Sequence, residues 1–122
     1  MITNPTADEL LLAVSSFIER IALQLKDRDV FLARVSVNAL ATVRREIASG
    51  GAAESAEHDR LADLLGHAGS VADLTDRLGD GIRGGAFDDR EAELLRHLKA
   101  TAIDQVKIDQ PHYSGLKAAL TP

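Results

Sequence analysis

Apolar residues recur at helical spacing through the first 47 residues, with one polar interruption at residues 26–29. Thr6 and Glu9 have the spacing of a capping box, so the first helix should begin there. The second should end at Gly50–Gly51, because glycine readily takes the left-handed conformation that closes helices. Each helix carries an apolar stripe that we expect to face the core. The stripes are Leu10, Val14, Phe17, Ile18, Ile21 and Leu25, and then Phe31, Leu32, Val35, Ala39, Leu40, Val43 and Ile47.

Two shorter helices are expected in the middle of the chain. One should run from about Glu54 to Leu65 and end at Gly66. The other should begin with Ser70 and Asp73 as a cap, and two glycines weaken its second half. Their leucine-rich faces are predicted to be buried. The residues concerned are Leu61, Leu64, Leu65, Val71, Leu74, Leu78 and Ile82.

A last long helix is expected from Asp88, as N-cap, to about Ile108, and Pro111 ends its pattern. Residues 109–122 should form a tail that either straps across the other helices or is partly disordered. The predicted core positions of this helix are Leu94, Leu95, Leu98, Ala102 and Val106. A polar flank of His97, Thr101 and Asp104 runs beside them, and a solvated surface is favoured there over a ligand site.

These patterns predict an all-α protein: a compact up-and-down bundle of about five helices, three long and two short, forming one domain over residues 1–122. No stretch alternates as a strand would, and no repeat recurs at a fixed period. Aromatic residues make up only 3% of the chain, so Leu, Ile, Val and Ala must do the packing, which favours helices over a β-sandwich.

The balance of charge argues against two classes of partner. With 14 basic and 19 acidic residues, the chain has a net charge of -5 and repels nucleic acid and anionic membranes. Arg34, Arg44 and Arg45 alone do not provide the basic footprint of a nucleic-acid protein. The absence of cysteine excludes disulfides and thiol catalysis. No apolar run approaches the ~20 residues that span a bilayer and no secretory signal opens the sequence, so we expect a cytoplasmic protein.

Familiar catalytic and cofactor motifs are weak here. Residues 79–84, GDGIRG, match a dinucleotide fingerprint by letter, but they fall at a predicted helix end instead of between a strand and a helix. Di-iron bundles need Glu-x-x-His, which this chain lacks. His58, His67, His97 and His112 are scattered over different elements and are expected to face solvent. We therefore predict no metal, no cofactor and no catalytic residues.

One strip of the second helix is the best candidate for a binding site. Arg34, Asn38 and Arg45 follow each other along one side of this helix, next to Phe31. Guanidinium groups suit phosphates or carboxylates, and an amide can orient a carbonyl. Two explanations stay open: recognition of an anion or a partner, or structural pairing with acids on neighbouring helices, which is favoured. The acids available for such pairing include Glu19, Asp104 and Asp109.

The order of these segments resembles a family of small bacterial proteins of uncharacterised function. The likeness covers almost the whole chain and rests on Pro5-Thr6-Ala7, Glu9-Leu10-Leu11, Phe31, Arg34-Val35, Asn38-Ala39-Leu40, Arg45-Glu46, Thr101, Asp104, Lys107-Ile108-Asp109, Pro111 and Tyr113. The resemblance implies an accessory protein, since members tend to be encoded beside acyl-CoA dehydrogenases and kinases of the aminoglycoside-phosphotransferase type. It transfers no catalytic residues. It draws attention to Tyr113, whose ring can anchor the tail in a groove.

Together these features favour a helical accessory or interaction protein that works with a larger enzyme, either an acyl-CoA dehydrogenase or a kinase-like one, through the second helix and Tyr113. The alternative is a small-molecule binder or enzyme that holds a phosphate- or carboxylate-bearing, CoA-like ligand on Arg34, Asn38 and Arg45. Leu12 and Leu23 lie away from the main stripe of the first helix, which predicts a homodimer.

Overall fold

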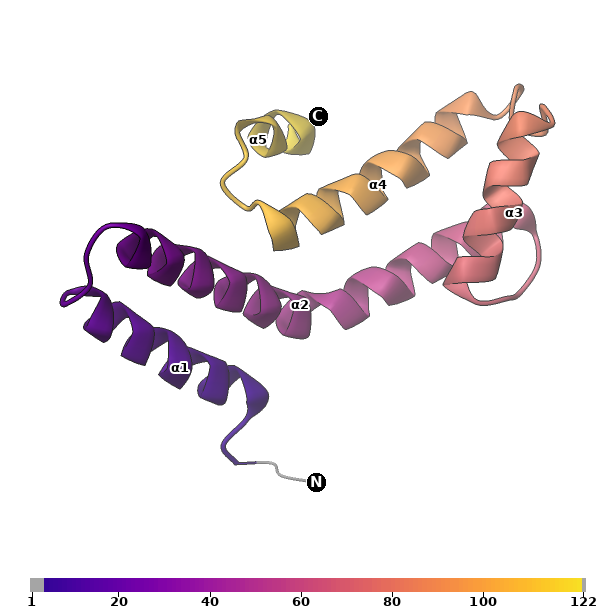
Figure 1. Cartoon of the computed structure of the whole chain (residues 1–122). Coiled ribbons are helices and arrows are strands. Elements are labelled where there is room, and N and C mark those ends of the chain that lie inside the picture. Colours follow the sequence, from indigo (N-terminus) through magenta and orange to yellow (C-terminus); the bar gives the residue numbers. More distant parts are fainter. Residues whose placement is uncertain (1–3, 122) are drawn as a thin grey trace. The chain divides into compact units, whose positions relative to one another are not determined.

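The computed structural model describes residues 4–121, and within this range the secondary structure is entirely helical (Figure 1). The helices are α1 (Ala7–Ala22), α2 (Arg28–Leu65), α3 (Val71–Arg83), α4 (Glu91–Asp109) and α5 (Ser114–Leu120). The predicted all-α fold class is confirmed. The contacts between residues divide the chain into two units, residues 1–49 and 50–122, and helix α2 contributes to both. No helix of residues 4–121 is long and apolar enough to cross a membrane.

Helix α2 is longer than predicted. It continues through Gly50–Gly51 over 38 residues, so the prediction of two separate helices in this region is wrong. Two glycines make a helix less favourable by about 2 kcal/mol relative to alanine, but they stop it only where the backbone turns left-handed. That turn occurs at Gly66, which has a φ of 75° and whose amide donates to the carbonyl oxygen of Ala62 at 2.8 Å. The predicted end of the helix at Gly66 is confirmed.

The starts of the other helices follow the predicted caps in two of three cases. The hydroxyl of Thr6 accepts from the amide of Glu9, and that of Ser70 accepts from the amide of Asp73, each at 3.1 Å. Asp88 is not the N-cap of α4, because its amide donates to the carbonyl oxygen of Gly85 in a preceding turn. Arg90 takes the cap position instead.

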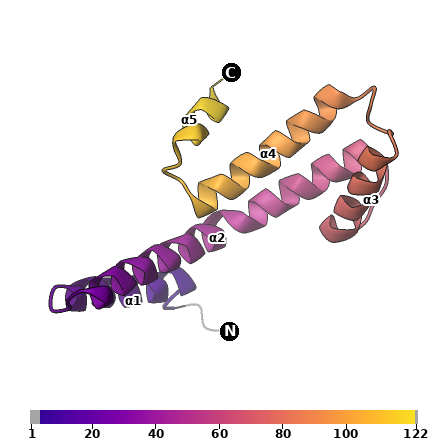
Figure 2. The ribbon, with the colours of Figure 1, turned by 45° about the horizontal axis from the view of Figure 1, so that its top comes forward.

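Unit 1 is an antiparallel hairpin of α1 and the first part of α2 (Figures 1 and 2). Its two most buried residues are small: Ser15 is 6% exposed and Ala33 is 7% exposed. The partly buried residues Leu11, Ile18, Val37 and Leu40 continue the same stripe along each helix. The small side chains of Ser15 and Ala33 allow the two helix backbones to approach closely at this level.

Most of the predicted core of unit 1 is exposed. Phe31 is 63% exposed and Phe17 is 51% exposed, and the prediction that the stripe from Phe31 to Ile47 forms the centre of the protein is wrong. The other predicted core residues that lie on the surface are Leu10, Val14, Leu32, Val35, Ala39, Val43 and Ile47. Each helix carries a second stripe of small and medium-sized residues, and the helices pack through that stripe.

Unit 2 contains the hydrophobic core. Leu61 and Leu64 of α2 pack with Leu74 and Leu78 of α3 and with Phe87 of the following loop. The predicted burial of these four leucines is confirmed, and Phe87 was not anticipated. A Cβ placed at Gly81 would lie 2.8 Å from a ring carbon of Phe87. The absence of a side chain at Gly81 therefore leaves room for the Phe87 ring in the core.

Arg90 fastens the α3–α4 loop to the end of α2. Its guanidinium donates to the carbonyl oxygen of Leu64 at 3.0 Å and to the carboxylate of Glu93 at 2.8 Å, and it lies over the Phe87 ring. A carbonyl in the last turn of a helix has no partner within the helix, so a cationic donor is favourable there.

Helix α4 packs only in part through the predicted face: Leu94, a predicted core residue, packs against the core of unit 2. His97 and Ile108 are buried, whereas Leu95 and Leu98 are exposed. The flank of His97, Thr101 and Asp104 is therefore not the solvated surface that we predicted, since its residues are buried or partly buried.

Candidate functional site

The structure places Arg34, Asn38 and Arg45 along one side of α2, in unit 1. A guanidinium nitrogen of Arg45 donates to the hydroxyl of Thr42 at 3.1 Å, and this hydroxyl donates to the carbonyl oxygen of Asn38 at 3.0 Å. Arg45 also makes a further interaction. Among residues 4–121, the side chains of Arg34 and Asn38 meet no hydrogen-bond or ion-pair partner. The predicted pairing with acids is thus not found for Arg34, and its guanidinium is available to a ligand or a partner.

Arg44 of unit 1 pairs with an acid, a role for which sequence reasoning did not single it out. Its Nε lies 2.8 Å from Oδ1 of Asp8, and its Nη2 lies 3.2 Å from Oδ2. These hydrogen bonds lower the pKa of Asp8, and partial desolvation opposes them. The two-point ion pair joins the start of α1 to α2 and leaves Arg44 committed to the fold.

A second polar cluster lies in unit 2, where Arg60 of α2 meets α4. Its Nε donates to Nδ1 of His97 at 3.3 Å, and Nη2 donates to the hydroxyl of Thr101 at 3.0 Å. Because Nδ1 accepts, the ring is neutral and carries its proton on Nε2. Burial lowers the pKa of His97, the charge of Arg60 lowers it further, and Glu57 acts in the opposite direction.

This cluster corrects the prediction that all four histidines face solvent, because His97 is only 5% exposed. The contact could not be anticipated from spacing, since Arg60 is 37 residues from His97 in the sequence. The donors of Arg60 are directed at protein groups, so the arrangement stabilises the packing of α4 on α2. No set of three or more His, Asp or Glu side chains able to hold a metal ion occurs in residues 4–121.

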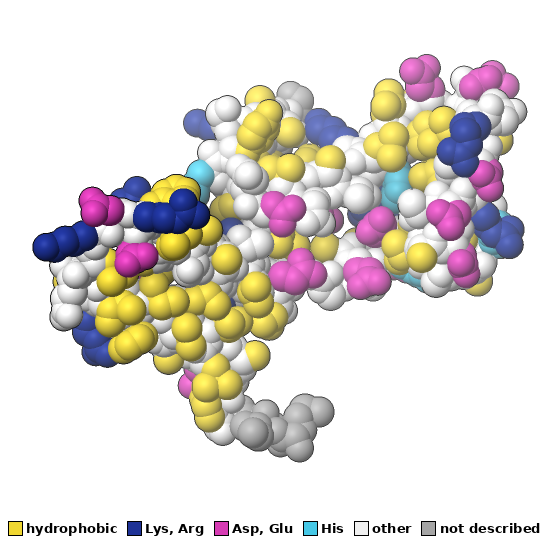
Figure 3. Space-filling model, viewed as in Figure 1, with side chains coloured by type: hydrophobic (Ala, Val, Ile, Leu, Met, Phe, Trp, Pro, Cys, Tyr) yellow, Lys and Arg dark blue, Asp and Glu magenta, His cyan; other side chains and the backbone are white. Residues whose placement is uncertain are grey.

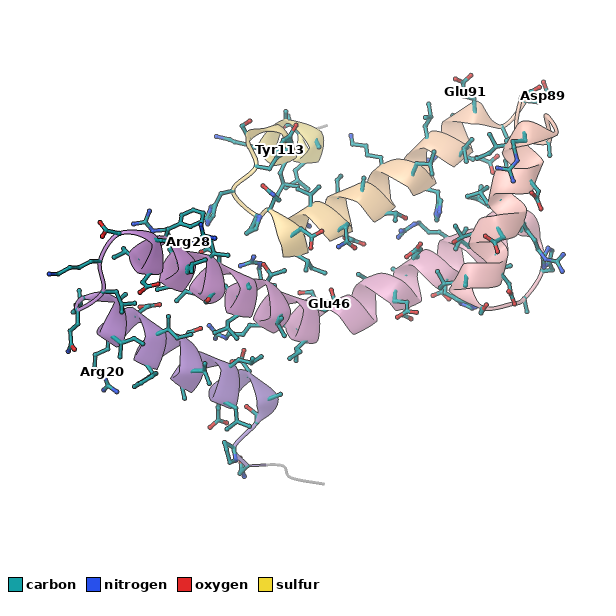
Figure 4. The ribbon with its side chains drawn as sticks, viewed as in Figure 1. Arg20, Arg28, Glu46, Asp89, Glu91 and Tyr113 are labelled. Carbon is teal, nitrogen blue, oxygen red and sulfur yellow. The ribbon has the colours of Figure 1, made fainter. Side chains whose placement is uncertain are left out.

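Tyr113 lies in unit 2, at the start of α5 (Figure 4). It is 56% exposed, and its ring lies against Gly115 so closely that a Cβ at that position would overlap it. It lines an apolar hollow of about 140 Å³ with Ile103 and Val106 of α4 and Leu116 of α5. The contacts of Tyr113 therefore contribute to the packing of α5 on α4. The strip of Arg34, Asn38 and Arg45 on α2 belongs to unit 1.

A group of exposed apolar side chains lies in unit 1. We call it the hairpin apolar face; it consists of the partly buried Ile21 and the exposed residues Leu10, Val14, Phe17, Leu32, Val35, Ala39, Val43 and Ile47. Helical spacing puts the members from each helix on one side of that helix. Figure 3 shows hydrophobic side chains gathered over α1 and the first part of α2. The strip of Arg34, Asn38 and Arg45 lies on the other side of α2.

These features define an all-helical protein with a well-packed C-terminal unit, an exposed N-terminal hairpin and a strip of polar side chains on α2. The chain belongs to the family described as "Domain of unknown function (DUF6285)", which matches residues 23–113. The matched segment includes α2, α3 and α4 and reaches Tyr113. Comparison with curated proteins and with solved structures gave no match.

Proposed function

We propose that the protein is a helical accessory protein that binds a larger enzyme through the strip on α2. One observation carries the proposal: Phe31 is 63% exposed beside Arg34 and Asn38, whose side chains meet no partner within residues 4–121. Aromatic and arginine side chains dominate the binding energy of many protein interfaces. An arginine that is not engaged by its own fold can donate several hydrogen bonds to a carboxylate or a backbone carbonyl of the partner.

The proposed partner is an acyl-CoA dehydrogenase or a kinase of the aminoglycoside-phosphotransferase type, in the cytoplasm. This choice rests on what the family resemblance of the sequence implies about the neighbouring genes. Two other polar side chains that could serve a catalytic site, Arg44 and Arg60, instead make contacts within the fold. Their engagement agrees with an accessory role.

The test is co-expression of the full chain with each neighbouring enzyme, followed by measurement of the mass of the complex and of its dissociation constant. Truncating Phe31 or Arg34 to alanine should weaken binding at least about tenfold, as expected for central interface residues. Leu23→Ala and Arg96→Ala are matched controls, since both residues are exposed and lie outside the strip. The proposal fails if neither enzyme forms a complex, or if Phe31→Ala and Arg34→Ala bind as tightly as the controls.

A second candidate function is favoured by the hydrogen bonds around Thr42. This residue links the Arg45 guanidinium to the backbone carbonyl of Asn38, and the Arg34 guanidinium and the Asn38 amide lie along the same side of α2. Such a set suits a phosphate- or carboxylate-bearing small molecule of the CoA type.

Calorimetry with CoA, an acyl-CoA and inorganic phosphate tests this alternative. If a ligand binds there, Arg34→Ala should abolish the heat of binding, and Arg34→Lys should restore it only in part, because lysine lacks the planar fork. Unchanged affinity in Arg34→Ala would remove the strip as the binding site.

A further inference from the structure

Unit 1 has no hydrophobic core of its own. Its buried residues within the described part of the chain are Ser15 and Ala33, whereas the buried leucines and Phe87 all lie in unit 2. Units of about 50 residues bury little surface and are marginally stable alone, and association is a common remedy. A partner surface that covers its apolar side chains would therefore stabilise the hairpin.

The hairpin apolar face is large enough to supply half of a dimer interface. Seven of its large side chains are each between 41% and 53% exposed. Together they present on the order of 600 Å² of apolar surface, at the upper limit for the largest patch of a typical monomer and close to the ~800 Å² that each partner contributes to a standard interface. Covering this face would complete a four-helix arrangement from two hairpins.

The charges along its outer edges indicate which partner fits. Arg20 of α1 and Arg28 of α2 lie near the turn, whereas Glu46 lies toward the open end of the hairpin (Figure 4). Glu9, in the first turn of α1, belongs to the same open end. Arg28 and Glu46 are 18 residues apart, which is five full helical turns, so they share one side of α2. Glu9 and Arg20 are 11 residues, about three turns, apart on α1. The other charged residues of the turn, Lys26, Asp27 and Asp29, are of both signs.

These charges are arranged symmetrically about one level of the hairpin. The ion pair of Asp8 with Arg44 sets the register, and seven residues inward from it Ser15 lies level with Val37. Val37 is midway between Arg28 and Glu46, and the midpoint between Glu9 and Arg20 falls just before Ser15. A single two-fold axis at this level can therefore relate both charge pairs at once, as a self-complementary interface requires.

We propose that the hairpin apolar face binds the same face of a second copy of this chain. The two-fold axis runs across the helices, so each helix lies antiparallel to its counterpart in a four-helix bundle. Arg28 of each copy then faces Glu46 of the other, and Arg20 faces Glu9. An axis along the helices would instead bring Arg20 near Arg28 and Glu9 near Glu46, and such like-charge contacts are unfavourable.

This dimer differs from the one predicted through Leu12 and Leu23, which lie on the opposite side of α1. It is also independent of the proposed enzyme-binding strip, which lies on the far side of α2. The two proposals are therefore distinguishable: the mass of the protein alone tests the dimer, and enzyme binding tests the accessory role.

The first experiment measures the mass of the full chain by analytical ultracentrifugation. We expect twice the 13.1 kDa of one chain at micromolar concentration. Val43→Glu buries an unpaired charge in the interface and should weaken association by about a hundredfold or more. Leu12→Glu and Leu23→Glu are the matched controls and should remain dimeric. A monomeric wild-type chain, or dissociation of the controls with retention of the Val43→Glu dimer, overturns the proposal.

The second experiment uses charge reversals, which leave the apolar packing unchanged. Arg28→Glu and Glu46→Arg should each weaken self-association about tenfold, because two attractive contacts per dimer become repulsive. Mixing these two variants restores opposite charges in both contacts, so the heterodimer should form in preference to either homodimer. The double variant R28E/E46R should regain the wild-type affinity. If mixing gives no heterodimer preference and the double variant stays weak, the antiparallel arrangement is wrong.

Discussion

The two units of this protein use their apolar residues in opposite ways. In unit 2, leucines from α2 and α3 surround Phe87 and are buried. In unit 1, the large apolar side chains are about half exposed, and a serine and an alanine occupy the packed seam. The comparison shows that similar helical periodicity can produce either a core or an open surface, depending on which of two stripes meets the neighbouring helix.

The two units also differ in the kinds of interaction that stabilise them. Unit 2 combines its core with polar groups that fix the positions of helices, such as Arg90 at the end of α2 and Arg60 against α4. Among the described residues of unit 1, the two-point ion pair of Asp8 with Arg44 and a seam around Ser15 and Ala33 join α1 to α2. We therefore expect substitutions in the core of unit 2 to have the largest effects on unfolding.

Truncation of Leu74 should produce the largest loss. This side chain is 1% exposed, and Leu74→Ala should lower the free energy of unfolding by about 3 kcal/mol through lost burial and a new cavity. Leu23→Ala is the control in unit 1, where the side chain is 87% exposed and the change should stay within about 0.5 kcal/mol. Chemical denaturation measures both, and equal losses would contradict the contrast between the units.

Two glycines of α3 provide a closer test of packing in unit 2. Gly81→Ala should destabilise by about 1–3 kcal/mol, because its Cβ would meet the Phe87 ring at 2.8 Å. Gly79→Ala should stabilise by up to about 1 kcal/mol, since its Cβ would meet only the flexible end of Arg83. Thermal unfolding measures the melting temperatures of both variants. If Gly81→Ala and Gly79→Ala raised the melting temperature equally, the position assigned to the Phe87 ring would be wrong.

The stability of unit 2 should also depend on pH through His97. The folded pKa is lowered, so below about pH 6.5 the unfolded chain binds a proton that the folded chain does not. Stability should therefore fall as the pH decreases from 7.5 to 5.5. His97→Gln cannot titrate, and the difference in melting temperature between it and the wild type should change across this range. A constant difference would show that the ring is not held neutral.

The smallest expected effect is that of the partly buried ion pair of Asp8 with Arg44 in unit 1. Because the folded pKa of Asp8 is lowered, the pair stabilises above the unfolded value near 3.8, and this contribution is lost as the pH falls through the folded pKa. Melting curves of the wild type and Asp8→Asn between pH 6 and pH 2.5 should converge at the acid end. If Arg44 is the cause, the same comparison of Asp8 with Asp8→Asn in a chain that carries Arg44→Gln should show no such pH-dependent difference in melting temperature.

Much of the fold was predictable because local signals decide it. The caps at Thr6 and Ser70 and the left-handed Gly66 each depend on residues within one turn, and the structure confirms them. The glycine pair at residues 50–51 misled because glycine permits a helix to end without requiring it. The cap of α4 was misplaced by two residues, since turns around Gly85 precede the helix.

The failures in packing have a different origin. Periodicity identifies an apolar stripe but does not say which stripe meets a neighbour, so Phe31 and Leu95 were assigned to a core that they do not enter. The partners of Arg44 and Arg60 are distant in the sequence, and their burial follows from helix pairing alone. The strip of Arg34, Asn38 and Arg45 was predicted as a group because all three residues belong to one helix.

The position of Tyr113 has a practical consequence for spectroscopy. The chain contains one tyrosine and no tryptophan, so its intrinsic fluorescence comes almost entirely from a single ring. That ring rests on Gly115 beside the apolar hollow between α4 and α5. Its emission therefore reports the docking of α5, while the loss of circular dichroism reports every helix. Following both signals during denaturation would reveal whether the C-terminal end separates before the remaining helices melt.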